Sequence, residues 1–273
     1  MNKRVFAAAA AGLAISASGA AAQLQLRARS YVFLLQDTRD GVYYLRAFDD
    51  SGVLYSEVAL DSGRLPTYTG FAVLDGRAFA TTYDFRTVVE FDPLTGEQIA
   101  SFSADPGEIV IGLDSDQTSL FVNGFTDWTA VYSPDGQLLD TLPKPDSFTG
   151  GGLLSVHGSS LFYYDEQFDT VVEADAAGNV LDTIAVSGFM AIPDGFDYDP
   201  SADEFLFSGH GVLWRFNRQG QMVSEITLDG FGPSFHNGFE YFPESIPAPA
   251  TLLTPLASAG ALCLRRRRNG SSG

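Results

Sequence analysis

A unit of about 42 residues recurs five times between residues 23 and 245 and constrains the fold more than any other feature of this sequence. Its first marker is a turn that opens with Asp, Asn or Ser and closes with Gly. The five closing residues are Gly52, Gly96, Gly136, Gly178 and Gly220, which step by 44, 40, 42 and 42 residues. Such a turn is typical of a tight hairpin, because glycine adopts positive φ without a steric penalty. The spacing therefore predicts a β-class repeat protein.

The second marker is a glycine followed by apolar residues that lead into a strand. It occurs at Gly70, Gly112, Gly152, Gly195 and Gly238, with steps of 42, 40, 43 and 43 residues. Because two independent markers share one period, they belong to one repeating unit.

Four short strands fit within each unit. In the second unit they are predicted over residues 70–74, 78–82, 87–91 and 98–102, and no segment of the body shows sustained helical periodicity. Four strands in 40–45 residues are typical of one blade of a β-propeller.

The first and last repeats complete one another. Residues 31–35, 42–48 and 53–60 match the second to fourth strands of a blade, and residues 238–242 match a lone first strand. The sequence thus predicts an all-β fold over residues 23–245, a five-bladed β-propeller closed by the C-terminal strand, which completes the N-terminal blade. Such closure removes the open edge of a linear array. A β-sandwich and an open solenoid are the alternatives.

The N-terminus has the three parts of a secretory signal peptide. Lys3 and Arg4 precede an apolar run over residues 5–15, and small residues end at Ala22. We expect residues 1–22 to be removed by cleavage after Ala22. A buried N-terminal helix is the alternative.

The C-terminus joins an uncharged stretch to a basic cluster. Residues 246–264 carry no charge over 19 residues, and Arg265, Arg266, Arg267 and Arg268 follow. As a helix this stretch would be about 28 Å long, barely the ~30 Å of a bilayer core, and its prolines weaken it further. It predicts a short, transient inner-membrane anchor whose arginines stay on the cytoplasmic side. Residues 269–273 form a polar tail.

This three-part order resembles the PEP-CTERM sorting signal, over residues 246–268. Pro247, Ala248 and Pro249 stand where that family has Pro-Glu-Pro, so Ala248 replaces the usual Glu. The resemblance implies processing by an exosortase-like membrane enzyme and display at the cell surface or in the extracellular matrix. A plain membrane anchor is the alternative.

The charge and cysteine content exclude several classes of function. The net charge is −18, and removing the six basic residues of the two ends leaves ten basic against 34 acidic residues in the body. This balance argues against nucleic acid as a partner, since phosphate binding needs a basic field. The one cysteine, Cys263, lies in the tail, which excludes disulfides and thiol catalysis from the body.

The blades also loosely resemble NHL and gluconolactonase-like propellers, as in residues 195–200 followed by residues 213–217. This similarity is little more than blade pattern, so it assigns no catalytic residue. The body contains no G-x-S-x-G, H-E-x-x-H or P-loop motif.

Polar residues are expected at one mouth of the central channel, where the segments entering the first strands meet the loops between the second and third strands. Carboxylate, imidazole and amide groups arranged in this way fit Ca²⁺ binding, or acid and base chemistry on a sugar or lactone. Solvated turn residues are the alternative. The candidates are Glu108, Asp194, His236 and Asn237 from the entering segments, and Asp84, Asp127, Glu166 and His210 from the loops.

Two functions follow as hypotheses. The first is an exported binding or scaffold module for an extracellular polysaccharide or protein, without catalysis, for which Phe125 and Trp128 are the best exposed aromatic candidates. The alternative is a secreted metal-dependent hydrolase or lactonase with its site at the channel mouth. Calcium is the one cofactor that the composition suggests.

Overall fold

The structure is a computed structural model that describes residues 27–37, 41–60, 68–82, 86–104, 110–116, 118–146, 148, 152–188, 193–231 and 234–242. The predicted signal peptide (residues 1–22) and sorting signal (residues 246–268) lie outside these residues and stay predictions. The described part of the chain contains no helix long and apolar enough to cross a membrane.

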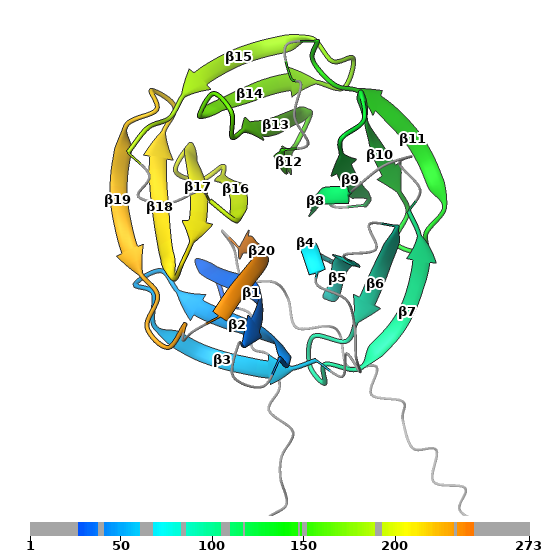
Figure 1. The fold of residues 1–273 in the computed structure, drawn as a ribbon, viewed down its shortest axis with the longest axis vertical. Coiled ribbons are helices and arrows are strands. Elements are labelled where there is room, and N and C mark those ends of the chain that lie inside the picture. Colours follow the sequence, from blue (N-terminus) through cyan, green and yellow to red (C-terminus); the bar gives the residue numbers. More distant parts are fainter. Residues whose placement is uncertain are drawn as a thin grey trace, which may run out of the picture.

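Within these ranges, twenty strands form five antiparallel sheets of four strands, arranged as blades around a central axis (Figure 1). Blade 1 consists of β20 (Ser234–Phe242), β1 (Ser30–Asp37), β2 (Tyr43–Asp49) and β3 (Leu54–Ala59); blade 2 consists of β4 (Tyr68–Leu74), β5 (Arg77–Thr82), β6 (Thr87–Phe91) and β7 (Gln98–Ser103). Blade 3 consists of β8 (Val110–Ser115), β9 (Leu120–Gly124), β10 (Trp128–Tyr132) and β11 (Leu138–Pro143). Blade 4 consists of β12 (Leu153–His157), β13 (Ser160–Asp165), β14 (Thr170–Asp175) and β15 (Val180–Ala185); blade 5 consists of β16 (Gly195–Asp199), β17 (Glu204–Gly209), β18 (Val212–Asn217) and β19 (Met222–Thr227). The fold is a five-bladed β-propeller, which confirms the prediction.

The C-terminal strand closes the ring. β20 pairs antiparallel with β1, from Ser30 opposite Phe242 to Asp37 opposite Ser234, with a register shift between Phe33 and Leu35. In Figure 1 the last strand lies beside the first strand of the chain, at the inner edge of blade 1. The N-terminal blade is therefore completed by the C-terminal segment, as the sequence predicts.

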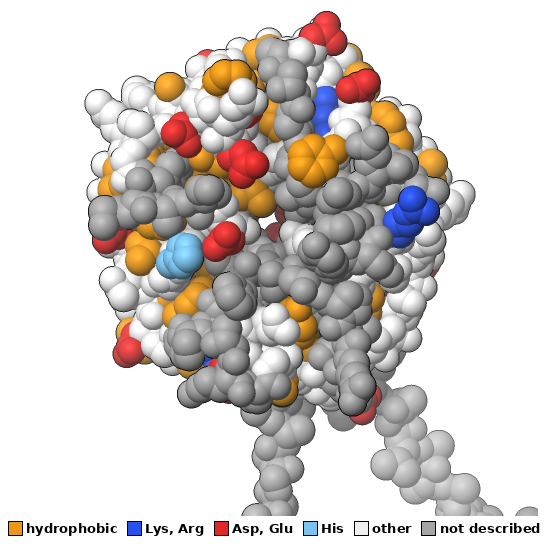
Figure 2. Space-filling view, viewed as in Figure 1, with side chains coloured by type: hydrophobic (Ala, Val, Ile, Leu, Met, Phe, Trp, Pro, Cys, Tyr) orange, Lys and Arg blue, Asp and Glu red, His pale blue; other side chains and the backbone are white. Residues whose placement is uncertain are grey.

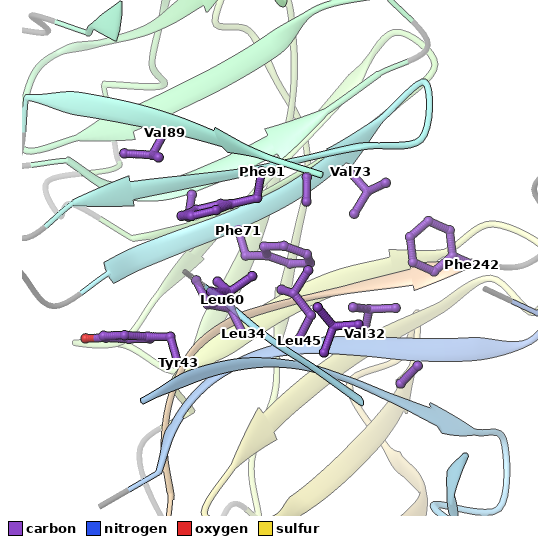
Figure 3. Packing of buried hydrophobic residues seen from close by; sticks show 14 residues of the cluster. Val32, Leu34, Tyr43, Leu45, Leu60, Phe71, Val73, Val89, Phe91 and Phe242 are labelled. Carbon is purple, nitrogen blue, oxygen red and sulfur yellow. The ribbon is translucent and has the colours of Figure 1, made fainter. Parts of the chain in front are cut away.

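The apolar core is divided among the interfaces between neighbouring blades. Each of five buried clusters of described residues joins one pair of blades. Figure 3 shows the cluster between blades 1 and 2, in which Phe71 lies close to Leu34 and Leu45 of blade 1. Burying one such side chain contributes roughly 2 kcal/mol, so the blades are held together mainly by apolar packing.

The hairpin between the third and fourth strands explains the first sequence marker. In blade 4, Asp175 Oδ1 accepts hydrogen bonds from the backbone N–H groups of Ala177 and Asn179, both at 2.9 Å. In blade 5, Asn217 Oδ1 accepts the same pair of bonds from Gln219 and Gln221. Asp and Asn recur here because their short side chains close the turn against its own backbone.

The closing glycine of each hairpin also lies against the outermost strand of the preceding blade. A Cβ atom at Gly220 would lie 1.8 Å from the carbonyl oxygen of Ala185, and one at Gly96 would lie 2.0 Å from that of Ala59. Both glycines have positive φ, 72° and 75°. Glycine therefore recurs for two reasons, the turn conformation and the close approach of two blades.

The contribution of the close approach can be measured with two matched variants. Gly220 and Gly76 share a φ of +72°, but a Cβ at Gly76 would meet nothing within 4 Å. We expect Gly76→Ala to lower the free energy of unfolding by about 1 kcal/mol, the cost of the left-handed conformation. Gly220→Ala should lower it by roughly 3 kcal/mol or more, because the blades must also separate. Urea unfolding measures both, and equal losses would contradict the close-approach argument.

Candidate functional site

Each face of the disc carries one kind of connection. The turn face carries the tight turns between first and second strands, and the loop face carries the loops between second and third strands together with the segments that enter the first strands. On the turn face, the mouth of the central channel is a cavity of about 500 Å³. Its lining includes Asp114, Ser115, Val156, Asp197, Tyr198 and Glu240. This cavity is the candidate functional site.

Five equivalent positions of the first strands lie at one level of the ring, and three of them line the cavity. Strand register identifies them, because each lies opposite a large apolar residue of the second strand: Phe79, Phe121, Phe162, Leu206 or Val32. The five positions are Ala72, Asp114, Ser155, Asp197 and Glu240. We call Asp114, Ser155, Asp197 and Glu240, together with Ser115, the carboxylate belt.

The carboxylate belt joins the five first strands through hydrogen bonds around the channel. Glu240 Oε2 accepts a bond from the N–H of Val73 at 3.2 Å, and Ser115 Oγ donates to the carbonyl of Val73 at 2.8 Å. Asp114 Oδ2 accepts from the N–H of Val156 at 2.5 Å.

Asp197 makes the two remaining links. Its Oδ1 accepts a bond from Ser155 Oγ at 2.8 Å, and its Oδ2 accepts one from the N–H of Tyr241 at 2.7 Å. Each pair of adjacent first strands is thus joined by at least one side-chain bond, and the ring of bonds closes.

The three carboxyl groups of the belt favour protonation. Burial and, to a smaller degree, the charge of Asp199 raise the pKa of Asp197 to about 6, although its hydrogen bonds oppose the rise. Burial raises the pKa of Asp114 well above its ordinary value, and the charge of Asp197 adds to the effect. Glu240 behaves alike, because burial and then the charges of Asp114 and Asp197 raise its pKa. Neighbouring carboxylates that burial removes in part from water cannot all be ionised without cost.

The belt acids bind protons more readily than ordinary carboxyl groups, but they are not arranged as a metal centre. Among the described residues, no group of three or more His, Cys, Asp or Glu side chains is placed to hold a metal ion. The belt oxygens instead accept N–H and O–H donors from the neighbouring strands. Two further groups stand at the cavity mouth, because His157 and Tyr198 line it with their ring centroids 5.8 Å apart.

Of the residues predicted from the sequence, the structure brings together Asp194 and His210. Both lie on the loop face of blade 5, where Asp194 donates its backbone N–H to the carbonyl of Ser208 at 2.8 Å. Partial burial raises the pKa of Asp194, and the nearby imidazole of His210 opposes that rise. The hollow beside Asp194 has a volume of only about 20 Å³.

Of the other predicted residues, the structure describes Asp127 and Glu166, which lie on blades 3 and 4 and not with that pair. Asp127 is exposed beside Lys144, whose pKa burial lowers to about 8 while the charge of Asp127 opposes the fall. Glu166 is exposed near Tyr164, whose pKa is raised by burial and, to a smaller degree, by nearby carboxylates. Glu108 and Asp84 lie outside the described residues. His236 and Asn237 belong to β20, and their side chains also lie outside what the structure describes.

The belt carboxylates were missed because they occupy strand positions. Ala72, Asp114, Asp197 and Glu240 each stand two residues after a marker glycine, and this alignment of acids is the signal that the sequence carries. The alignment fails in blade 4. There Leu153, and not Gly152, occupies the position equivalent to Gly195, so Ser155 stands three residues after the marker glycine.

The loop face displays two aromatic side chains on neighbouring blades. Phe125, between β9 and β10, is 49% exposed, and Phe168, between β13 and β14, is 60% exposed. Trp128 instead packs partly buried against the apolar cluster between blades 2 and 3. Figure 2 views the disc from this face, where apolar and acidic side chains surround a narrow central opening.

Comparison with known proteins supports the fold. No protein-family model matches the chain, and no curated protein matches it. A chain in the crystal structure of a nidogen/laminin complex is similar, with a TM-score of 0.52 and 13% identity over 78% of this chain and 86% of the other. Glutaminyl cyclase of Myxococcus xanthus has a TM-score of 0.49 and 14% identity, over 80% and 94% of the two chains. At 13% identity the likeness to the chain of the nidogen/laminin complex shows the β-propeller fold alone.

The bond between Ser155 and Asp197 gives a test of the belt. We expect Ser155→Ala to lower the free energy of unfolding by about 1–2 kcal/mol at pH 7, since the hydroxyl stabilises the ionised carboxylate. The loss should be smaller at pH 5, because the protonated carboxyl group accepts a weaker bond. Urea unfolding at the two pH values measures this. Ser224→Ala on the outer strand β19 is the control, expected within about 0.5 kcal/mol of the parent. An equal loss for both variants would remove the belt's role in stability.

Proposed function

We propose that this chain is an exported five-bladed propeller that binds a neutral extracellular polysaccharide through its loop face. In this proposal residues 1–22 direct export, and residues 246–268 form a Pro-Ala-Pro sorting signal that an exosortase-like enzyme processes. The product would be held at the cell surface or in the extracellular matrix after transient anchoring in the inner membrane. Binding, not catalysis, would be its role.

The observation that carries the proposal is the exposed pair Phe125 and Phe168. Two phenylalanines that leave about half or more of their surface in water stand in equivalent loops of adjacent blades. Binding residues concentrate in loops that a rigid scaffold positions, and both rings stand in such loops. The flat face of an aromatic ring stacks on the apolar face of a sugar ring, as it does on other flat partners.

Polar groups in the same loops support a sugar as the ligand. Asp127 follows Phe125 by two residues, and Glu166 precedes Phe168 by two residues. Both acids are exposed, and carboxylates accept hydrogen bonds from sugar hydroxyls. The net charge of −18 favours a neutral polymer over an anionic one, because an acidic domain repels a polyanion.

The cavity on the turn face supports binding without catalysis. Each carboxyl group of the belt accepts a hydrogen bond from a neighbouring strand. A general acid or base must reach the substrate, whereas these oxygens already serve to join blades. The belt is therefore better suited to structure than to hydrolysis.

Loss of the two aromatic rings should weaken polysaccharide binding. We expect Phe125→Ala and Phe168→Ala each to reduce affinity for the neutral extracellular polysaccharide of the producing cells roughly fivefold, the value of one stacking contact. Isothermal titration calorimetry with the purified polymer measures the affinity, and thermal melting shows that the variants fold.

Leu181→Ala is the matched control, because Leu181 is 56% exposed but lies on the outer strand β15, away from the loop face. It should bind like the parent protein. If both phenylalanine variants keep full affinity, the loop face is not the binding surface. If the parent binds no polymer, the proposed ligand class is wrong.

Processing is tested separately by intact-mass spectrometry of the protein recovered from the medium and from the inner membrane. We expect a mature form that begins near Gln23 and has lost the arginine cluster that starts at Arg265. Replacing all four arginines with alanine should leave the precursor unprocessed. An intact tail in the inner membrane of cells that produce the parent protein would support a plain anchor and contradict sorting.

A further inference from the structure

Two carboxyl groups of the belt hold the strand that closes the ring. β20 is the last described strand, and beyond its pairing with β1 it contacts the first strands of the two neighbouring blades. On one side the N–H of Tyr241 donates to Asp197 of β16 at 2.7 Å. On the other side Glu240 accepts the N–H of Val73 of β4 at 3.2 Å. A carboxyl group thus joins the closing strand to the neighbouring first strand on each side. We call Asp197 and Glu240, with these two hydrogen bonds, the clasp.

The acids of this clasp act on one another through their charges. Asp114 of β8 and Asp197 of β16 both act on Glu240 through their charges. β4 and β12 contribute Ala72 and Ser155 at this level, and β1 places Val32 opposite Glu240.

At the cavity mouth the titratable side chains are those of Asp116, His157, Tyr198 and Tyr241. Among the described residues, the cavity lining includes neither lysine nor arginine. Asp199, whose charge acts on Asp197, is paired with Arg215 at 2.8 Å.

We propose that the carboxylate belt is a pH-responsive clasp on β20, which holds the closing strand firmly in mildly acidic medium and loosens it as the medium becomes alkaline. Protonation removes the repulsion among three adjacent acids, while the N–H donors can still bond to the carbonyl oxygens of neutral carboxyl groups. Ionisation restores the repulsion around β20, the first strand that no tight turn joins to the second strand of its own blade, because β1 lies at the other end of the described chain. The ring closure is therefore the element whose stability depends on the belt.

Proton linkage determines whether ionisation of the belt stabilises or destabilises the folded protein. The folded protein binds these protons more tightly than the unfolded chain, because burial raises the pKa of each belt acid. The stability that protonation contributes is fully present below about pH 4, the ordinary range of carboxyl groups, and is lost as the pH rises through about 6 and beyond.

Carboxylates elsewhere have the opposite dependence in a lower window. The hairpin turn bonds lower the pKa values of Asp49 and Asp175, so their contribution is lost only as the pH falls below about 4. The two effects act in separate ranges. A maximum of stability near pH 5 is expected, which is lower than neutral.

The experiment combines thermal melting from pH 4.5 to 9 with hydrogen exchange of the β20 amides. We expect the melting midpoint to fall by several degrees between pH 5 and pH 8. The β20 amides should open roughly tenfold more often at pH 8, after correction for the intrinsic exchange rate, while those of β13 and β14 change little.

Glu240→Gln removes the charge and keeps an acceptor for the N–H of Val73, so it should flatten the pH dependence and slow opening of β20 at pH 8. Glu97→Gln is the matched control, since Glu97 is exposed on a hairpin of blade 2, and it should keep the full dependence. Asp114→Asn gives a second test of the same charge cluster if Glu240→Gln fails to fold.

Three results would overturn the proposal. One is a parent melting midpoint that stays constant or rises between pH 5 and pH 8. Another is a Glu240→Gln or Asp114→Asn protein that keeps the parental slope. The third is alkaline opening spread equally over all blades, because a clasp on β20 must act locally at the closure.

Discussion

Contact between successive blades is the constraint on which this structure depends. A four-stranded sheet with apolar faces cannot bury them alone, so each blade needs a neighbour on both sides, and only a closed ring provides that for all five. The five apolar clusters supply most of the energy of these contacts. The distance between blades is set by the hairpin glycines: a Cβ at Gly96 or Gly220 would lie 2.0 Å or less from a carbonyl oxygen of the preceding blade.

Much of the fold could be predicted because the same constraint acts five times on local sequence. A glycine needed for both a turn and a close contact recurs at fixed spacing, and its opening Asp or Asn bonds to the turn's own backbone, as at Asp175. The closing strand could be predicted from counting alone, since residues 238–242 lack partners in their own repeat. The offset at Gly152 could not, because only pairing shows that Leu153 stands where other blades have glycine.

The candidate site was harder to predict, for a physical reason. Residue type and turn propensity direct attention to acids in loops, such as Asp127 and Glu166, which the structure leaves exposed and apart from the pair of Asp194 and His210. Asp114 and Glu240 look like ordinary strand residues in the sequence. Their partners, the N–H groups of Val156 and Val73, belong to other repeats about 42 and 167 residues away. No local pattern encodes a backbone donor on a neighbouring blade.

Acids at the belt positions specify the register in which neighbouring first strands meet, which apolar residues could not do. An apolar side chain would pack in several registers, whereas a largely buried carboxylate is satisfied best when a specific N–H of the next strand is opposite it. Ala72 cannot bond to the next blade through its side chain. At that interface Ser115 of blade 3 instead donates to the carbonyl oxygen of Val73 in blade 2. The belt thus favours one register of closure. The repulsion among Asp114, Asp197 and Glu240 is the cost of that specificity, and the same repulsion makes closure sensitive to pH.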